Sequence, residues 1–206
     1  MTSILRAALA AVVRRGAHVL DGLAAQLAPP RRTLILGGAR SGKSSYAEQL
    51  LAGRRRVIYL ATGAPPGDDE EWAERIRRHR ERRAAHWETV ETIHIAAALR
   101  AADAPVLIDC LATWLARICD EAGAWDAAPG WKERLEHEVE ELVQAWRAAR
   151  VPVVAVSNEV GSGIVPSTPS GRLFRDELGV LNSRMASESD AVLLMVAGRP
   201  IRLEAP

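Results

Sequence analysis

An α/β fold of the P-loop NTPase type, with a mostly parallel sheet flanked by helices, is predicted by three observations. Short apolar segments alternate along the chain with segments of helical spacing, which is typical of a parallel sheet covered on both faces. The first apolar segment, 33–36, is followed at once by the glycine-rich run GGARSGKS at 37–44. The chain has 206 residues, of which 48% are hydrophobic, enough to bury the core of one such domain.

The first thirty residues are predicted to form an amphipathic helical appendage. Apolar residues recur at helical spacing between Leu5 and Leu27, and a pair of prolines ends the segment. An Arg-rich, acid-poor start also fits an organelle transit peptide. We favour an appendage on a cytoplasmic protein, because the segment has no apolar signal core and no clear cleavage site. The predicted boundaries are 1–30 for the appendage and 31–206 for the P-loop domain.

The strands are predicted from apolar runs and the helices from apolar residues at helical spacing. Apolar runs bounded by turn residues predict strands over 33–36, 56–62, 88–92, 105–109 and 152–157, with a terminal hairpin at 191–196 and 201–203. Helical spacing, or the charged composition of an exposed helix, predicts helices over 45–51, 69–83, 95–101, 111–119 and 131–150. Ligands of such sheets bind at the carboxyl ends of the strands, where the motifs below fall.

Composition excludes several classes of protein. The formal net charge of +1 argues against a nucleic-acid binder that works through broad positive charge. The two cysteines, Cys110 and Cys119, are too few for a metal cluster and are interpreted as buried thiols rather than a disulfide. No apolar stretch approaches the length of a membrane span.

The run at 37–44 has the pattern and the strand–loop–helix setting of a phosphate-binding loop. Its residues are Gly37, Gly38, Ala39, Arg40, Ser41, Gly42, Lys43 and Ser44. Glycines allow backbone N–H groups to surround a phosphate, Lys43 reaches the β- and γ-phosphates, and the Ser44 hydroxyl can ligate Mg²⁺. Lys43 is one of only two lysines among 27 basic residues. A chance glycine-rich turn is the alternative, which the flanking strand and helix disfavour.

Asp109 closes the apolar strand predicted at 105–109. A P-loop protein needs a second oxygen ligand for Mg²⁺, and a carboxylate at the end of a neighbouring strand supplies it. The alternative is that Asp109 caps the helix that begins near Leu111. We favour the metal role, because the phosphate-binding loop already implies a metal.

The segment 158–166, Asn-Glu-Val-Gly-Ser-Gly-Ile-Val-Pro, together with the loop at 37–44, resembles one enzyme family. This is the bifunctional adenosylcobinamide kinase / adenosylcobinamide-phosphate guanylyltransferase (CobU/CobP) family of cobalamin biosynthesis. The likeness spans 34–203 and includes the pattern Arg-Ile-Arg-Arg-His-Arg at 75–80 and His86-Trp87.

The resemblance implies two transfer reactions with ATP and GTP as substrates. The first phosphorylates adenosylcobinamide, and the second transfers GMP from GTP through a guanylylated histidine. His79 matches the position of that nucleophile, and the surrounding arginines would favour its neutral form. Without the resemblance, a histidine in such a charged helix would more often be a solvent-exposed side chain than a nucleophile. One family feature is absent, since some relatives carry a second histidine where this chain has Arg78.

The resemblance also implies the nucleotide contacts and a homotrimer. The implied contacts beyond the loop are Thr62, Gly63, Ala64, Arg80, Glu81, Arg82, Arg83, Glu91 and Asp109. Glu159 and the pair Gly161 and Gly163 either shape a substrate pocket or form a turn that needs glycine, and the two interpretations stay open. Two other functions also stay open: a P-loop kinase of another small metabolite without the guanylyl transfer, and a non-catalytic nucleotide switch.

Overall fold

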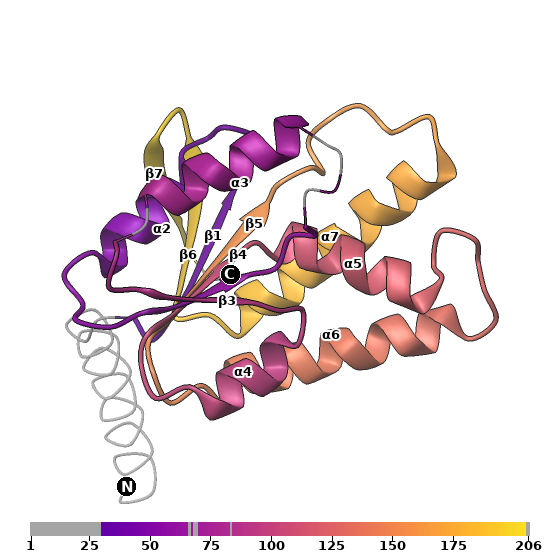
Figure 1. The fold of residues 1–206 in the computed structure, drawn as a ribbon. Helices are drawn as coiled ribbons and strands as arrows, with labels where there is room; N and C mark the ends of the chain where they lie inside the picture. The colour runs from indigo at the N-terminus through magenta and orange to yellow at the C-terminus, as the bar shows by residue number, and fades with distance from the viewer. Residues whose placement is uncertain (1–29, 66, 68–69, 83, 205–206) are drawn as a thin grey trace, which may run out of the picture. The chain divides into compact units, whose positions relative to one another are not determined.

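The computed structural model describes residues 30–204 except 66, 68–69 and 83, and this part contains one seven-stranded sheet (Figure 1). The side chains of Trp72, Arg75, His79 and Arg82 lie outside the description, as do residues 1–29 of the appendage predicted at 1–30. The strands are β1 (Arg32–Gly37), β2 (Ile58–Ala61), β3 (Glu88–Glu91), β4 (Val106–Asp109), β5 (Val153–Asn158), β6 (Ala191–Val196) and β7 (Arg199–Leu203).

The sheet has the order β3-β2-β4-β5-β1-β6-β7, and only the β6–β7 pair is antiparallel. The predicted parallel sheet and terminal hairpin are therefore confirmed. Gly37 pairs with Asn158, and Ala61 pairs with both Glu91 and Asp109. The carboxyl ends of β1 to β5 consequently lie along one edge, as the sequence predicted.

Five of the six helices in the described part of the chain were predicted, with ends that differ by a few residues. The helices are α2 (Lys43–Leu51), α3 (Glu70–Arg82), α4 (Ile95–Ala101), α5 (Leu111–Ala122), α6 (Trp131–Arg147) and α7 (Pro169–Ser187). The C-cap of α5 is Gly123, with a left-handed φ of 70°, and glycine adopts this conformation without a Cβ clash. No helix among the described residues is long and apolar enough to cross a membrane.

Helix α7 was missed by the sequence analysis, which assigned no element between β5 and β6. Two glycines, Gly171 and Gly179, lie within this helix and lower its propensity. The helix forms because Thr168 caps its first turn, accepting a hydrogen bond from Gly171 N at 3.1 Å, with proline at the first position. Its buried residues follow helical spacing, which was the available signal: Leu178, Leu181, Asn182 and Met185.

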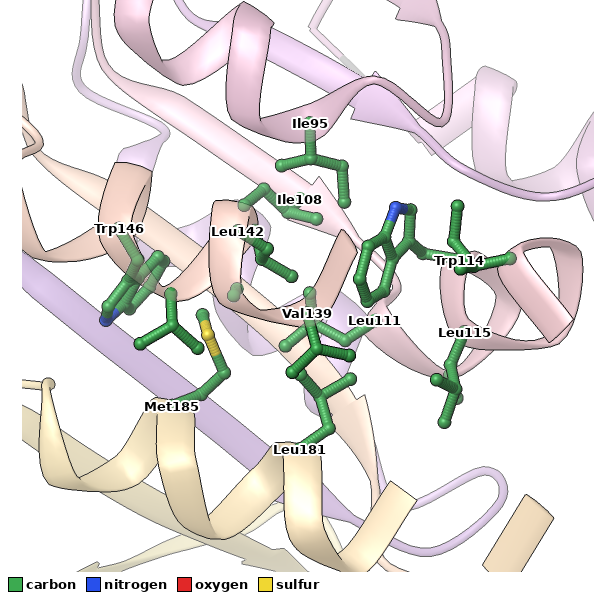
Figure 2. Packing of buried hydrophobic residues seen from close by; sticks show 14 of the residues in the cluster. Ile95, Ile108, Leu111, Trp114, Leu115, Val139, Leu142, Trp146, Leu181 and Met185 are labelled. Atoms are coloured by element: carbon green, nitrogen blue, oxygen red, sulfur yellow. The ribbon is translucent and has the colours of Figure 1, made fainter. Parts of the chain in front are cut away.

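The larger apolar cluster lies between one face of the sheet and the helices α4 to α7. Ile108 of β4, Trp114 of α5, Trp146 of α6 and Met185 of α7 all belong to it (Figure 2). Trp114 donates its indole N–H to the Ile93 carbonyl at 2.8 Å, which satisfies the polar atom of a buried ring.

The smaller apolar cluster lies on the opposite face of the sheet, beneath α2. It contains Ile35, Tyr59 and Leu107 from three strands and Ala47 and Leu51 from α2. Successive strand residues alternate between the two faces. Side chains that face this cluster therefore point to the side of the sheet on which the phosphate-binding loop continues into α2.

Candidate functional site

The glycine-rich loop joins the carboxyl end of β1 to the first turn of α2. Arg40 and Gly42 have φ values of 56° and 93°, so the loop turns through two left-handed residues. Lys43 begins α2 and is only 7% exposed. Its Nζ donates a hydrogen bond to the Gly38 carbonyl at 3.0 Å. A buried ammonium lying across a loop at a helix N-terminus can contact an anion bound there.

Gly37 occupies a position with no room for a side chain. A Cβ there would lie 2.6 Å from Ser41 Oγ and 3.0 Å from the Met195 carbonyl oxygen. Met195 belongs to β6 and pairs with Gly37 itself, so its backbone cannot move away without breaking the sheet. Glycine at this position lets the loop close over Ser41.

We expect Gly37→Ala to lower the free energy of unfolding by about 2 kcal/mol, because the added methyl overpacks the junction of β1 and β6. Denaturant unfolding measures the change. Gly38→Ala is the matched control for stability, since a Cβ at Gly38 would meet no atom within 4 Å. Equal destabilisation by both changes would contradict this account of Gly37.

The turn between β6 and β7 contacts the loop from the other side. Gly198 N donates a hydrogen bond to the Ser41 carbonyl at 3.0 Å, and a Cβ at Gly42 would lie 3.3 Å from Gly198 Cα. The C=O and N–H of a trans peptide point in opposite directions. The contact with Gly198 therefore turns the Gly42 N–H away from the hairpin and leaves it for a ligand.

Asp109, at the end of β4, faces the first turn of α2. Its Oδ1 accepts a hydrogen bond from Ser44 Oγ at 3.2 Å, and its Oδ2 accepts one from the Tyr59 hydroxyl at 2.6 Å. The N-cap of α5 is Cys110, so the capping position belongs to the next residue. Ser44 and Asp109 lie together, as the predicted metal site requires.

The donor set of Ser44 and Asp109 suits Mg²⁺. Both offer hard oxygen donors, and Mg²⁺ is usually bound by one or two such protein ligands together with substrate phosphates and waters. Among the described residues, no group of three or more His, Cys, Asp or Glu could hold a metal ion. A cation at Ser44 and Asp109 would therefore depend on the phosphates of a bound nucleotide.

Thr62 follows β2 and ties it to the start of α5. Its Oγ1 donates to the Cys110 carbonyl at 2.7 Å, accepts from Cys110 N at 2.9 Å and lies 2.8 Å from Thr113 Oγ1. The side chain is completely buried. This structural role was not foreseen from the sequence, and the predicted nucleotide contact of Thr62 stays a prediction. Gly63 and the exposed Ala64 continue the loop at the same edge.

The two cysteines are free thiols, in agreement with the sequence-based interpretation that they form no disulfide; Cys119 is buried as expected, whereas Cys110 is only partly buried. Burial raises the pKa of both, that of Cys119 to about 11. Both are therefore protonated at neutral pH, and a protonated thiol is a poor nucleophile.

A cleft of about 480 Å³ lies between the end of α3 and β3. Arg80 and Glu91, two of the predicted nucleotide contacts, form an ion pair on its wall. Trp87 also lines the cleft and is only 8% exposed, and its Nε1 has no hydrogen-bond partner among the described residues. The remaining lining residues are Ala84, Ala85 and Thr89. The cleft thus runs along β3, with the buried indole N–H of Trp87 just before the strand and the Arg80–Glu91 pair at its carboxyl end.

Helix α3 carries His79, the predicted nucleophile. The side chains of His79 and Arg82, and the whole of Arg83, lie outside the described residues. The backbone places position 79 one residue before Arg80, which lines the cleft. The role of His79 therefore stays a prediction.

The charges on α3 differ from the basic surface that the sequence suggested. Arg77 and Arg78 both pair with Glu74 at 2.7 Å, and Arg77 also pairs with Glu81. Hydrogen bonds from Arg77 and Arg78 lower the pKa of Glu74 to about 2. Because glutamates neutralise these two arginines, the arginines favour the neutral form of His79 less than the sequence suggested. Glu81 is paired with Arg77 along the helix, and its predicted nucleotide contact stays a prediction.

Glu159 closes its own turn after β5. Its Oε1 accepts hydrogen bonds from Gly161 N at 2.6 Å and Ser162 N at 3.2 Å. Its backbone N–H donates to the Gly37 carbonyl at 3.0 Å, so this turn borders the phosphate-binding loop. Of the two open interpretations, these contacts support turn formation by Glu159 and Gly161. Ile164, in the same segment, is 97% exposed.

Two residues of the site were missed by the sequence analysis as site residues. Tyr59 was assigned only to a strand, and Trp87 only to the family pattern. For Tyr59 the available signal was a phenol within an otherwise aliphatic buried strand, since a buried Tyr hydroxyl usually needs a partner.

Comparison with known proteins gives a match to the family described as cobinamide kinase / cobinamide phosphate guanyltransferase over residues 33–203. The bifunctional adenosylcobalamin biosynthesis protein CobU of Salmonella typhimurium is 36% identical over 181 residues, which cover 83% of this chain and 98% of that protein. CobU of Escherichia coli is 35% identical over 180 residues, covering 83% and 98%. The bifunctional adenosylcobalamin biosynthesis protein CobP of Pseudomonas aeruginosa is 41% identical over 180 residues, covering 84% and 97%.

Proposed function

This chain belongs to the cobinamide kinase / cobinamide phosphate guanyltransferase family, and we propose that it catalyses both transfers on adenosylcobinamide. The product of the two steps is adenosylcobinamide-GDP. The observation that supports the proposal is that a phosphate-binding loop and the Ser44–Asp109 pair lie at the carboxyl edge of the sheet, and that the cleft beside α3 reaches this edge at Glu91. A P-loop kinase of another small metabolite would use only the first two of these features.

In the first step the aminopropanol hydroxyl of adenosylcobinamide attacks the γ-phosphorus of a nucleoside triphosphate. The new O–P bond forms as the bond from the γ-phosphorus to the bridging oxygen breaks, the hydroxyl proton passes to solvent, and the nucleoside diphosphate leaves with the bridging oxygen. Lys43 and the backbone N–H groups of the loop hold the phosphates and stabilise the charge that develops on them. Mg²⁺, held by Ser44 and Asp109, would supply further neutralisation of that charge.

In the second step a neutral imidazole nitrogen of His79 attacks the α-phosphorus of GTP. A P–N bond forms, the bond between the α-phosphorus and the bridging oxygen breaks, and pyrophosphate leaves. A phosphate oxygen of adenosylcobinamide phosphate then attacks the same phosphorus, and breakage of the P–N bond returns the histidine. Arg80 and Glu91 lie at the cleft beside this helix and are proposed to bind the GTP.

Product analysis tests the proposed function. The protein is incubated with adenosylcobinamide, ATP and GTP. The corrinoids are then separated and identified by their masses in mass spectrometry. We expect adenosylcobinamide phosphate to appear first and adenosylcobinamide-GDP to follow. If adenosylcobinamide phosphate forms without adenosylcobinamide-GDP, the protein catalyses only the kinase step.

We expect Asp109→Asn to raise the Mg²⁺ concentration that half-saturates the kinase step by at least about tenfold, because the amide is a weaker ligand than the carboxylate. Kinase rates measured against Mg²⁺ concentration give this value, and thermal unfolding gives the stability. An unfolded variant with unchanged metal dependence would contradict the metal role and support a purely structural Asp109.

A further inference from the structure

The Tyr59 side chain connects the smaller apolar cluster to the carboxyl edge of the sheet. Tyr59 is 1% exposed, and its ring packs with Ile35 and Leu107. Strand β2 pairs with β4 in a register that places Ala61 opposite Asp109. Tyr59 lies two residues before Ala61 and therefore points to the same face. The length of the phenol carries its hydroxyl to within 2.6 Å of Asp109 Oδ2.

This hydrogen bond fixes the rotation of the Asp109 carboxylate. The terminal torsion of an aspartate is broad, so the side chain alone does not define which oxygen faces which neighbour. A bond from a buried hydroxyl to an ionised carboxylate is short and strong. With Oδ2 held by Tyr59, Oδ1 is directed towards Ser44 Oγ, 3.2 Å away.

We propose that Tyr59 is a positioning residue that holds Asp109 in the orientation needed to ligate a nucleotide-bound divalent cation. The proposal rests on the metal role of Ser44 and Asp109 in the proposed function. Tyr59 does not itself touch the nucleotide or the cation, and it acts only through the carboxylate. Its loss should therefore weaken the binding of the cation without changing the binding of the nucleotide alone.

Calorimetric titration of Tyr59→Phe with a non-hydrolysable GTP analogue tests the proposal, with one series over a range of Mg²⁺ concentrations and one in EDTA. We expect the affinity in EDTA to stay within about twofold of wild type. We expect the Mg²⁺ concentration that half-saturates the complex to rise by roughly tenfold, the range found when a residue that orients a metal ligand is removed. Electron paramagnetic resonance of bound Mn²⁺ gives a second reading that does not depend on activity.

Tyr46→Phe is the matched control. Tyr46 is the other of the two tyrosines in the chain and packs against the same apolar cluster from α2. We expect this variant to keep the wild-type affinity in both series. A loss in Tyr59→Phe that is equal in Mg²⁺ and EDTA, or no loss in either, would overturn the proposal. A wild-type protein that gains no affinity from Mg²⁺ would overturn the metal site as well.

A measurement that keeps the Tyr59 hydroxyl covers the case in which Tyr59→Phe fails to fold. In Tyr46→Phe, biosynthetic 3-fluorotyrosine is incorporated only at position 59. We expect its fluorine resonance to shift when Mg²⁺ is added to the complex with the GTP analogue, and to stay in place when Mg²⁺ is added without the analogue. A resonance that ignores Mg²⁺ in the complex would contradict the link from Tyr59 through Asp109 to the cation.

Discussion

Lys43→Ala is expected to reduce phosphoryl transfer to adenosylcobinamide by at least about 10³-fold, which corresponds to about 4 kcal/mol of transition-state stabilisation. Lys43 is a buried ammonium at the start of α2, and its Nζ already lies across the loop, 3.0 Å from the Gly38 carbonyl. Removing it leaves the charge on the transferring phosphoryl group without the cation aimed at it. Steady-state kinase assays with adenosylcobinamide and ATP or GTP measure the loss.

Lys132→Ala is the control for Lys43→Ala. Lys132 is the only other lysine of the chain. It lies in α6, with its Nζ 5.5 Å from the centre of the Trp131 ring. We expect this variant to keep wild-type kinase turnover. Turnover near the wild-type value in Lys43→Ala would contradict the assignment of the phosphate-binding loop.

His79→Ala is expected to abolish the formation of adenosylcobinamide-GDP while the kinase step largely survives. The guanylyl transfer needs an imidazole nitrogen as the attacking group, whereas the kinase step uses Lys43, Ser44 and a carboxylate. The two activities are measured on the same preparation, by the yield of adenosylcobinamide phosphate and of adenosylcobinamide-GDP. A parallel loss of both would indicate that position 79 supports the fold or the nucleotide pocket rather than one reaction.

His86→Ala is the control for His79→Ala. His86 is exposed, and its Nε2 lies 3.2 Å from the Arg54 carbonyl. We expect this variant to retain both activities. If His86→Ala loses the guanylyl transfer and His79→Ala keeps it, His86 is the nucleophile and the alignment of the histidine pattern is wrong.

The strands of the sheet could be predicted because each buried strand is marked by an apolar run in its own short segment of sequence. Apolar runs such as 105–109 and 152–157 stand out where a strand is buried on both faces, and the phosphate-binding loop fixed which strand and helix begin the domain. Helix α7 was not predictable in the same way. Two internal glycines lower its helix propensity, and its buried residues at helical spacing are confined to its second half, so the signal in the sequence is weaker than that of the strands.

The sequence predicted most residues of the candidate site but not all of the hydrogen bonds and ion pairs between them. The pairing of Ser44 with Asp109 could be expected, because Ser44 lies in the first turn of the helix that follows β1 and Asp109 ends β4, and the carboxyl ends of these parallel strands lie at one edge of the sheet. The Tyr59–Asp109 contact depends on the register between β2 and β4, which no pattern in the sequence specifies. The glutamates that neutralise Arg77 and Arg78 on α3 are visible in the sequence at helical spacing from these arginines, but the prediction for His79 rested on the arginines alone.

Labelling with GTP that carries its label on the α-phosphate tests the central claim most directly. The wild-type protein is incubated with this GTP without adenosylcobinamide and then separated by denaturing electrophoresis. A phosphoramidate between imidazole and GMP is labile in acid and stable in alkali, so we expect protein-bound label that vanishes after mild acid and persists in alkali. Absence of bound label, or label that is stable in acid and lost in alkali, would contradict a guanylylated histidine in this protein.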